Sequence, residues 1–458
     1  MNVAALRSQF PALAARADRA PPIYLDSACM SLVPRPVLDA MEEYYRDFPG
    51  CAGRSLHRFA EEVNRRFEGS RSACARFLGR SDPRGVVFVR NATEAINLVA
   101  QGIAWQRGDR VLLSDREHNS NLVVWQRLAA ERGIRIEIVA VPDEGPFDVD
   151  AIVPALERGV RLVSLFHTSN LDGRTLPIRA ITERAHDAGA EVLFDGCQAA
   201  PHERVDLDRI GVDYYALSGH KMLGPTGTGV LAAAFEPLSQ LRPLVLGGET
   251  VERTTLTSHE LRPPPHRFEA GLQNYAGALG LHAALDFLSR VGLDEIRAQQ
   301  LTLNRRVTEA LADERRVRTI GPAEPAERPS IFAFALEGID CHDAALFLDE
   351  GHGVMVRSGM NCVHSWYDRH GLAGTVRASF YLYNDPRDAD GLVDGLRELL
   401  ARIPGDTLSG TSAGTAASPP RRASGRRRSA GSSAAAARSA RPRGRAGRGR
   451  AGSAAGSG

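Results

Sequence analysis

Lys221 is the only lysine in a chain whose lysines and arginines together number 57. A lysine amine can lose its proton and attack a carbonyl to form an imine, whereas an arginine guanidinium stays protonated and is a poor nucleophile. A coding bias toward arginine would also leave a solitary lysine, without any chemical role. The residue type favours a reactive amine at this position over a mere coding bias, and the neighbouring motifs help to decide between these two explanations.

Two motifs with polar residues follow neighbouring apolar runs. Asp195 closes the run 192–194, and an unpaired carboxylate at such a place is costly unless it meets a cation. The motif Ser218-Gly-His-Lys221 follows the next run, 214–217. Each could also be an ordinary turn or cap, so neither motif is specific by itself.

A histidine and a helix start follow two further apolar runs. His118 comes after the run 111–113, and its imidazole can stack on a flat ring or simply cap the next helix. The segment 90–94 after the run 86–89 has the spacing of a capping box, whose free amide groups and Thr93 hydroxyl can receive a phosphate. Most capped helices bind nothing, so this motif too needs the others.

Together the four motifs match the needs of one cofactor, pyridoxal 5′-phosphate (PLP). PLP requires an amine for a Schiff base, an acid for its ring nitrogen, a flat partner for its ring and a cradle for its phosphate. The residues that supply these groups are, in that order, Lys221, Asp195, His118 and Thr93. This set predicts an enzyme of amino-acid chemistry.

The elements that carry these motifs alternate between strand and helix from about 86 to 235. Expected strands are 86–89, 111–113, 134–141, 162–166, 192–194, 214–217 and 230–234. The alternation predicts an α/β fold with a mostly parallel sheet flanked by helices. Ligands of such sheets bind at the carboxyl ends of the strands, where the four motifs fall.

A second, helix-rich pattern begins at about 275. Its expected strands are 331–336, 354–356 and 375–379, which predicts a smaller α+β domain. We therefore expect four parts: an N-terminal segment 1–20 that packs on the small domain, a large PLP-binding domain 21–275, a small C-terminal domain 276–404 and a disordered tail 405–458.

The tail carries eleven arginines and one acid, Asp406, against a formal net charge of +2 for the whole chain. It is almost free of large apolar residues, so it cannot bury enough surface to offset the entropy of ordering. A cluster of arginines can bind nucleic acid through contacts to its phosphates. Because the tail lacks interleaved aromatic residues and the rest of the chain is acidic, we expect no nucleic-acid binding.

Composition and cysteine spacing exclude several other classes. The 458 residues are 43% hydrophobic and 24% charged, which is ordinary for a soluble globular protein. No apolar run reaches the ~18 residues of a membrane helix, and the first ten residues lack the pattern of a secretory signal. The six cysteines are scattered without a C-x-x-C pair, which indicates neither a zinc site nor a disulfide framework. We expect a cytoplasmic protein without a metal.

On these motifs the chain resembles the class V, fold-type I PLP-dependent aminotransferase family, most closely the SufS-type cysteine desulfurases. The resemblance runs from about Tyr24 to Leu400, and its most specific segments are 195–198, 218–221, 267–271 and 357–362. It implies a homodimer that converts L-cysteine to L-alanine and keeps the sulfur as a persulfide on Cys362. It also implies a sulfur-acceptor protein, and a role in iron–sulfur cluster assembly or another sulfur pathway.

The resemblance further implies a role for each site residue. Those implied for the cofactor are Lys221 as its covalent anchor, Asp195 on the pyridine nitrogen, Gln198 on the phenolic oxygen, His118 on the ring and in proton movement, and Thr93, Ser218 and His220 on the phosphate. Those implied for the substrate are Asn170 beside the ring and Arg377 on the carboxylate, which suits the bidentate fork of a guanidinium.

Cys362 separates a desulfurase from related chemistries. A nucleophilic sulfur needs a thiolate with access and a cationic neighbour, for which Arg357 and His364 are candidates by sequence. If Cys362 only packs, as free cysteines commonly do, the chain is another class V enzyme such as a C–S lyase, epimerase or aminotransferase. Cys197, next to Asp195, is expected to pack.

Two positions depart from the family pattern. Asn361 stands where many relatives have a histidine, which removes one proton donor beside Cys362. Leu272 replaces a threonine whose hydroxyl often reaches the partner subunit's phosphate, so one phosphate hydrogen bond is in question.

Overall fold

The computed structural model describes residues 2–14, 21–53 and 55–403. The tail expected at 405–458 lies outside the described residues, as does part of the expected N-terminal segment. No helix in the described ranges is long and apolar enough to cross a membrane.

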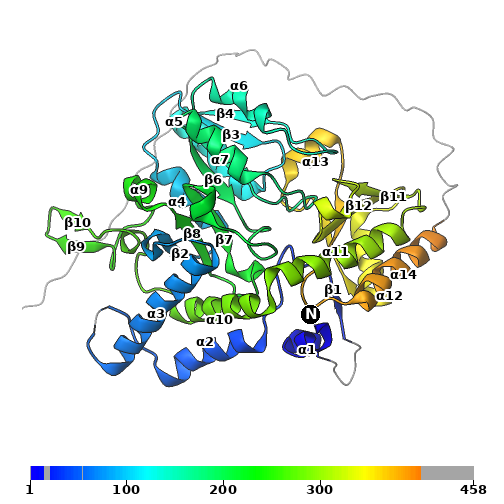
Figure 1. Ribbon diagram of the computed structural model, residues 1–458, viewed down its shortest axis with the longest axis horizontal. Coiled ribbons are helices and arrows are strands. Elements are labelled where there is room, and N and C mark those ends of the chain that lie inside the picture. The colour runs from blue at the N-terminus through cyan, green and yellow to red at the C-terminus, as the bar shows by residue number, and fades with distance from the viewer. Residues whose placement is uncertain (1, 15–20, 54, 404–458) are drawn as a thin grey trace, which may run out of the picture. The chain divides into compact units, whose positions relative to one another are not determined.

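A seven-stranded sheet forms the centre of the larger part of the fold (Figure 1). In spatial order its strands are β2 (Val86–Val89), β8 (Gly229–Ala233), β7 (Tyr214–Ser218), β6 (Glu191–Asp195), β5 (Val160–Phe166), β3 (Arg110–Ser114) and β4 (Arg135–Val139). Among these strands β8 alone is reversed in direction, so it pairs antiparallel with both β2 and β7. The predicted mostly parallel α/β sheet is confirmed, and the seven expected runs differ from the strands by at most two residues at either end.

The strands of this sheet are apolar on both faces because helices cover both. In β3, Leu112 belongs to one buried cluster, whereas Val111 and Leu113 belong to another. The same alternation separates Phe194 from Leu193 in β6. Side chains of a strand point to opposite faces in turn, so a sheet covered on both sides needs near-continuous apolar runs.

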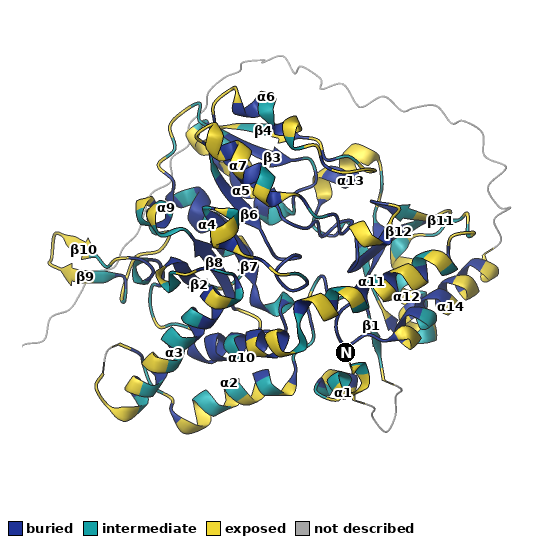
Figure 2. Ribbon diagram, viewed as in Figure 1, coloured by how far each residue is buried: buried dark blue, intermediate teal, exposed yellow. Residues whose placement is uncertain are grey.

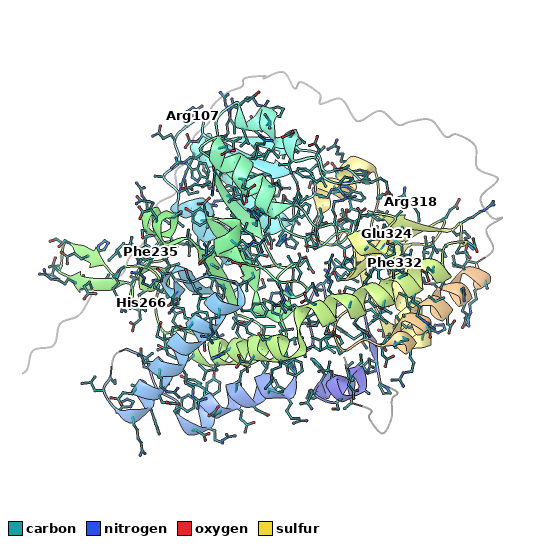
Figure 3. The ribbon with its side chains drawn as sticks, viewed as in Figure 1. Arg107, Phe235, His266, Arg318, Glu324 and Phe332 are labelled. Atoms are coloured by element: carbon teal, nitrogen blue, oxygen red, sulfur yellow. The ribbon has the colours of Figure 1, made fainter. Side chains whose placement is uncertain are left out.

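A smaller, four-stranded antiparallel sheet lies near the carboxyl-terminal helices (Figure 1). Its strands are β11 (Val317–Ile320), β12 (Ile331–Leu336), β15 (Thr375–Ser379) and β14 (Arg357–Gly359). Phe332 of β12, labelled in Figure 3, is buried in its core. The strand expected at 354–356 corresponds to β13 (Val354–Met355), which pairs with β1 (Ile23–Tyr24) and not with the small sheet. The strand β14, which follows it and joins the small sheet, was not predicted from the sequence.

Helices surround both sheets and expose their outer faces (Figure 2). They are α1 (Val3–Arg7), α2 (Arg35–Asp47), α3 (Arg58–Phe77), α4 (Ala92–Gly102), α5 (Val123–Arg132), α6 (Val153–Leu156), α7 (Ile178–Asp187), α8 (Leu207–Ile210), α9 (Phe235–Gln240), α10 (Tyr275–Val291), α11 (Leu293–Ala310), α12 (Cys341–His352), α13 (His364–His370) and α14 (Pro386–Arg402). A hairpin of β9 (Val251–Thr254) and β10 (His259–Leu261) projects away from the body at the left of Figure 1.

The N-terminal residues contact the carboxyl-terminal part of the chain. Arg7 lies 2.6 Å from Asp388 at the start of α14, and the Phe10 ring packs against Tyr383 at 4.9 Å between centroids. Helix α10 packs against α2 and α3, on the side of the larger sheet. The division of the chain at 20, 275 and 404 stays a prediction.

A buried ion pair holds the segment after the hairpin against the larger sheet. Arg71 of α3 donates two hydrogen bonds to Glu269, at 2.7 and 2.9 Å, and both side chains are almost fully buried. Glu269 also accepts from the Phe88 amide of β2 at 2.8 Å. A bidentate pair of this kind fixes the relative orientation of the two side chains in addition to stabilising their opposite charges. The turn that leads into it begins at His266, labelled in Figure 3.

Candidate active site

A pocket of about 200 Å³ lies at the carboxyl ends of β5, β6 and β7. Its lining includes all ten site residues expected from the sequence: Thr93, His118, Asn170, Asp195, Gln198, Ser218, His220, Lys221, Cys362 and Arg377. Their roles stay predictions, but the fold brings them together from both sheets and from loops up to 284 residues apart, the separation of Thr93 and Arg377. Carboxyl strand ends are where open α/β sheets bind ligands.

Parallel strands β6 and β7 place the acid and the lysine at the same edge. β6 ends at Asp195, which is paired in register with Ala216 of β7. β7 ends at Ser218, and the short turn Gly219–Lys221 then carries the amine into the pocket lining. Asp195 accepts a hydrogen bond from the Cys197 amide at 3.0 Å, which orients its carboxylate.

Gly196 leaves the space that this arrangement requires. A Cβ at this position would lie 2.0 Å from Cζ of Tyr215 and 2.3 Å from its oxygen. The Tyr215 ring is fully buried, and its hydroxyl is hydrogen-bonded to Nδ1 of His167 at 2.9 Å, so the ring has little room to move. The Asp-Gly-Cys-Gln motif therefore depends on glycine for packing beneath the acid.

His118 caps a turn, as one of its two interpretations predicted, while its stacking on a flat ring stays a prediction. Its Nδ1 accepts a hydrogen bond from the Ser120 amide at 3.1 Å, so it caps the turn Asn119–Asn121. Its ring also lines the pocket. Burial, with the nearby charge of Lys221, lowers the pKa of His118 to about 4, so the imidazole is neutral above that pH. Because Nδ1 is the acceptor, the neutral ring carries its proton on Nε2.

The start of α4 provides donors for an anion. The Ala92 amide donates to the Ser218 hydroxyl at 2.9 Å, which ties the helix start to the end of β7. The Thr93 and Ser120 hydroxyls lie 2.7 Å apart, and both residues line the pocket. Sequence reasoning missed Ser120, although its position two residues after His118 was the available signal. Hydroxyls and first-turn amides at a helix start suit a phosphate.

Unpartnered buried atoms in the pocket wall point to a polar ligand. Gln198 donates to the Ala28 carbonyl at 2.7 Å, but its Oε1 is buried without a hydrogen-bond partner. Arg377 donates to the Asn170 carbonyl at 2.7 Å, yet its Nε is also unpartnered. Unmade hydrogen bonds of buried groups are costly. With the amine, carboxylate, imidazole and hydroxyls of the wall, these atoms fit PLP and an amino-acid substrate.

The loop that carries Cys362 is held in a strained backbone conformation. Asn361 and Cys362 have φ of 48° and 58°, in the left-handed region that disfavours side chains. The Asn119 amide donates to the Cys362 carbonyl, and the Asn170 side chain donates to the Asn361 carbonyl, both at 2.7 Å. Asn361 itself donates to the hydroxyl of Tyr367 at 3.0 Å. Its side chain thus anchors the loop, where a histidine would offer a proton.

The cysteines of the pocket have different surroundings. Cys362 is half-buried, and nearby His364 pairs with Asn119 through Nδ1 at 2.7 Å. Cys197 is buried in an apolar cluster, and burial raises its pKa to about 12, as suits a packing residue. Arg357 lies with Nη1 3.7 Å from the sulfur of Cys29, a pocket cysteine that sequence reasoning missed.

Known proteins share this chain's sequence and fold. Residues 23–392 match the aminotransferase class-V family. The chain is 38% identical to a probable cysteine desulfurase of Streptomyces coelicolor, with 87% of this chain and 97% of that protein covered. It is similar to the apo structure of the cysteine desulfurase from Thermococcus onnurineus NA1, with 36% identity, a TM-score of 0.80, and 83% of this chain and 95% of that chain covered.

The chain is also similar to the solved cysteine desulfurase CsdA, in an S-sulfonic acid form, from Escherichia coli. The two are 32% identical with a TM-score of 0.80, and the match covers 88% of this chain and 99% of that chain.

Replacing Gly196 tests the packing beneath the acid. Gly196→Ala should lower the affinity for PLP by about 10- to 100-fold, because overpacking of this size costs about 1–3 kcal/mol and must displace Asp195 or Tyr215. Titration of the PLP-free protein, followed by cofactor absorption, measures the change. Gly69→Ala, in α3 with open space around its Cβ, is the matched control. Equal affinity in both variants would contradict the prediction.

Proposed function

Because the chain belongs to the aminotransferase class-V family and to the cysteine desulfurases within it, we propose that it converts L-cysteine to L-alanine and keeps the sulfur as a persulfide on Cys362. The resemblance expected from the motifs is confirmed at the level of the family. The observation that carries the proposal is that the chain's only lysine and a half-buried cysteine line one pocket.

The enzyme depends on PLP, which supplies an electrophilic carbonyl and an electron sink for bonds at the α-carbon of an amino acid. In this proposal Lys221 is the covalent anchor, Asp195 holds the pyridine nitrogen, and Gln198 holds the phenolic oxygen. His118 would stack on the ring. The phosphate would be held by Thr93 at the start of α4, by Ser218 at the end of β7 and by His220 in the turn that follows.

Arg377 binds the substrate carboxylate, and Asn170 helps to position the substrate. The Arg377 guanidinium is held from both sides, by the Asn170 carbonyl at 2.7 Å and by Asp26 at 3.5 Å. Its side chain is 3% exposed, so water competes little for the bidentate pairing that a carboxylate offers. His118 holds its proton on Nε2, where it can pass the proton to the reacting substrate.

Cys362 completes the reaction as the nucleophile. Its thiolate forms a sulfur–sulfur bond to the substrate while the carbon–sulfur bond of the substrate breaks. The electron pair of that bond stays with the carbon skeleton, which gains a proton and leaves as alanine. The hydrogen bonds from Asn119 and Asn170 to this loop hold the sulfur at the pocket instead of in solvent.

We further propose that the enzyme is a cytoplasmic homodimer that passes sulfur to an acceptor protein, for iron–sulfur cluster assembly or another sulfur pathway. The six cysteines form no disulfide, which suits a reducing compartment. Exposed apolar side chains support the dimer: Leu272, within the segment 267–274, is 67% exposed, Val245 is 54% exposed, and both line a second cavity of about 300 Å³. Exposed apolar patches of this kind mark interfaces.

The first test replaces the anchor. Lys221→Arg should abolish alanine formation while the protein stays folded, because the positive charge is kept but imine chemistry is lost. Circular dichroism checks the fold, and borohydride reduction of the wild-type holoenzyme should attach PLP to the peptide that contains Lys221. A label on any other peptide, or an active arginine variant, would refute the cofactor assignment.

The second test separates a desulfurase from the other class V activities. Cys362→Ser should bind PLP and cysteine but release alanine at least ~10²-fold more slowly, because a serine hydroxyl is a far weaker nucleophile toward sulfur than a thiolate. Mass spectrometry of cysteine-treated wild type should find one added sulfur on the Cys362 peptide. A serine variant with near wild-type turnover would favour a C–S lyase, epimerase or aminotransferase.

The third test concerns the dimer. Light scattering at assay concentration should show a dimer, and Leu272→Asp should weaken its association by about tenfold or more, because a charge would enter an apolar contact. Leu346→Asp, at a similarly exposed leucine of α12, is the matched control and should remain dimeric. A monomer with full activity would argue against the interface.

A further inference from the structure

A second accessible thiol lies in the pocket of Cys362. Cys29 follows β1 and lines this pocket together with Cys362 and Lys221. All six cysteines fall within the described residues, and three of them line the pocket. Since Cys197 is buried with a raised pKa, Cys29 and Cys362 are the two half-buried cysteines in the lining of this pocket.

The loop of Cys29 is fixed to residues that would hold the cofactor. The carbonyl of Ala28 accepts from the Gln198 side chain at 2.7 Å, and the Ser31 amide donates to the His220 carbonyl at 2.8 Å. Cys29 lies between these two attachments. Its sulfur is therefore held at the pocket wall by the same elements that shape the site.

Arg377 joins the loop of Cys29 to the loop of Cys362. Its Nη2 lies 3.5 Å from Asp26, three residues before Cys29, and its Nη1 donates to the Asn170 carbonyl at 2.7 Å. The Asn170 side chain donates in turn to the carbonyl of Asn361, next to Cys362. The two thiol loops thus flank one buried guanidinium.

The same guanidinium indicates an anionic ligand between the two loops. Arg377 is nine-tenths or more buried and lines the pocket, yet its Nε has no hydrogen-bond partner. An amino-acid carboxylate bound there would place the substrate in the space that both sulfurs face. Arg357, with Nη1 3.7 Å from the Cys29 sulfur, offers a donor to a negative charge on that sulfur.

From this geometry we propose that Cys29 is a second sulfur acceptor, which takes the terminal sulfur from the persulfide of Cys362. The inference rests on the proposed function. The Cys29 thiolate attacks the outer sulfur of the Cys362 persulfide, a new sulfur–sulfur bond forms on Cys29, and Cys362 leaves as a thiolate. This exchange needs no oxidant or reductant, because one persulfide and one thiolate are present before and after it. Cys362 is then free for a second turnover before any acceptor protein arrives.

The proposal predicts the amount and the place of enzyme-bound sulfur. In a rapid-quench experiment with the holoenzyme, excess L-cysteine and no acceptor or other reductant, wild type should form two alanines per active site in the burst. Cys29→Ala should form one, a twofold reduction in burst amplitude whatever the rate. Mass spectrometry should find one added sulfur on the Cys29 peptide as well as one on the Cys362 peptide of wild type.

Two further variants complete the test. Cys51→Ala removes a half-buried cysteine that does not line the pocket, and its burst should stay at two. Cys362→Ser should leave Cys29 without sulfur, because the transfer passes through Cys362. A wild-type burst of one with sulfur only on Cys362, or sulfur on Cys29 in Cys362→Ser, would overturn the proposal. Failure of the proposed function would look different, since wild type would then form no alanine at all.

Discussion

The parallel pairing of β6 with β7 is the constraint on which the site depends. It aligns the ends of two strands at one edge, so that Asp195 and the turn bearing Lys221 open on the same pocket. The pairing in turn requires Gly196, whose missing side chain leaves room for the ring of Tyr215. The acid and the amine are therefore placed by backbone hydrogen bonds and packing, which is more exact than placement by two independent loops.

The second constraint is the docking of the Cys362 loop. Two consecutive residues in the left-handed region cost about 1–3 kcal/mol each. The hydrogen bonds from Asn119 and Asn170 offset this strain and come from the loops after β3 and β5 of the larger sheet. The proposed nucleophile, Cys362, is thus carried by one part of the chain and held in place by another.

Arg377 links these constraints. It comes from β15 of the smaller sheet, contacts Asp26 from the N-terminal region, and reaches Asn170 from the larger sheet. A group so buried and so surrounded keeps its position before a substrate arrives, which reduces the cost of ordering on binding. Cys29 and Cys362 line the same pocket as Arg377, so the proposed substrate-binding residue and the proposed sulfur relay share one framework.

Sequence alone predicted the larger sheet and the cofactor, and the residues that it proposed for the site line one pocket. Lys221, Asp195, His118 and Thr93 could be found because each joins a residue type to the end of an apolar run, and strand ends of such sheets meet at one edge. The alternation of strands and helices determined the fold class for the same local reason.

Tertiary structure alone decided how loops meet. That β13 pairs with β1 while β14 joins the small sheet depends on which strands lie alongside, and a short apolar run carries no information about its partners. The contact of the Ser120 hydroxyl with Thr93, 27 residues away in the chain, places that hydroxyl beside the start of α4. Cys29 lies 333 positions before Cys362 in the chain, and hydrogen bonds between distant segments, such as that of Gln198 to the Ala28 carbonyl, bring it to the same pocket. Such contacts between distant segments depend on packing, which local residue patterns do not encode.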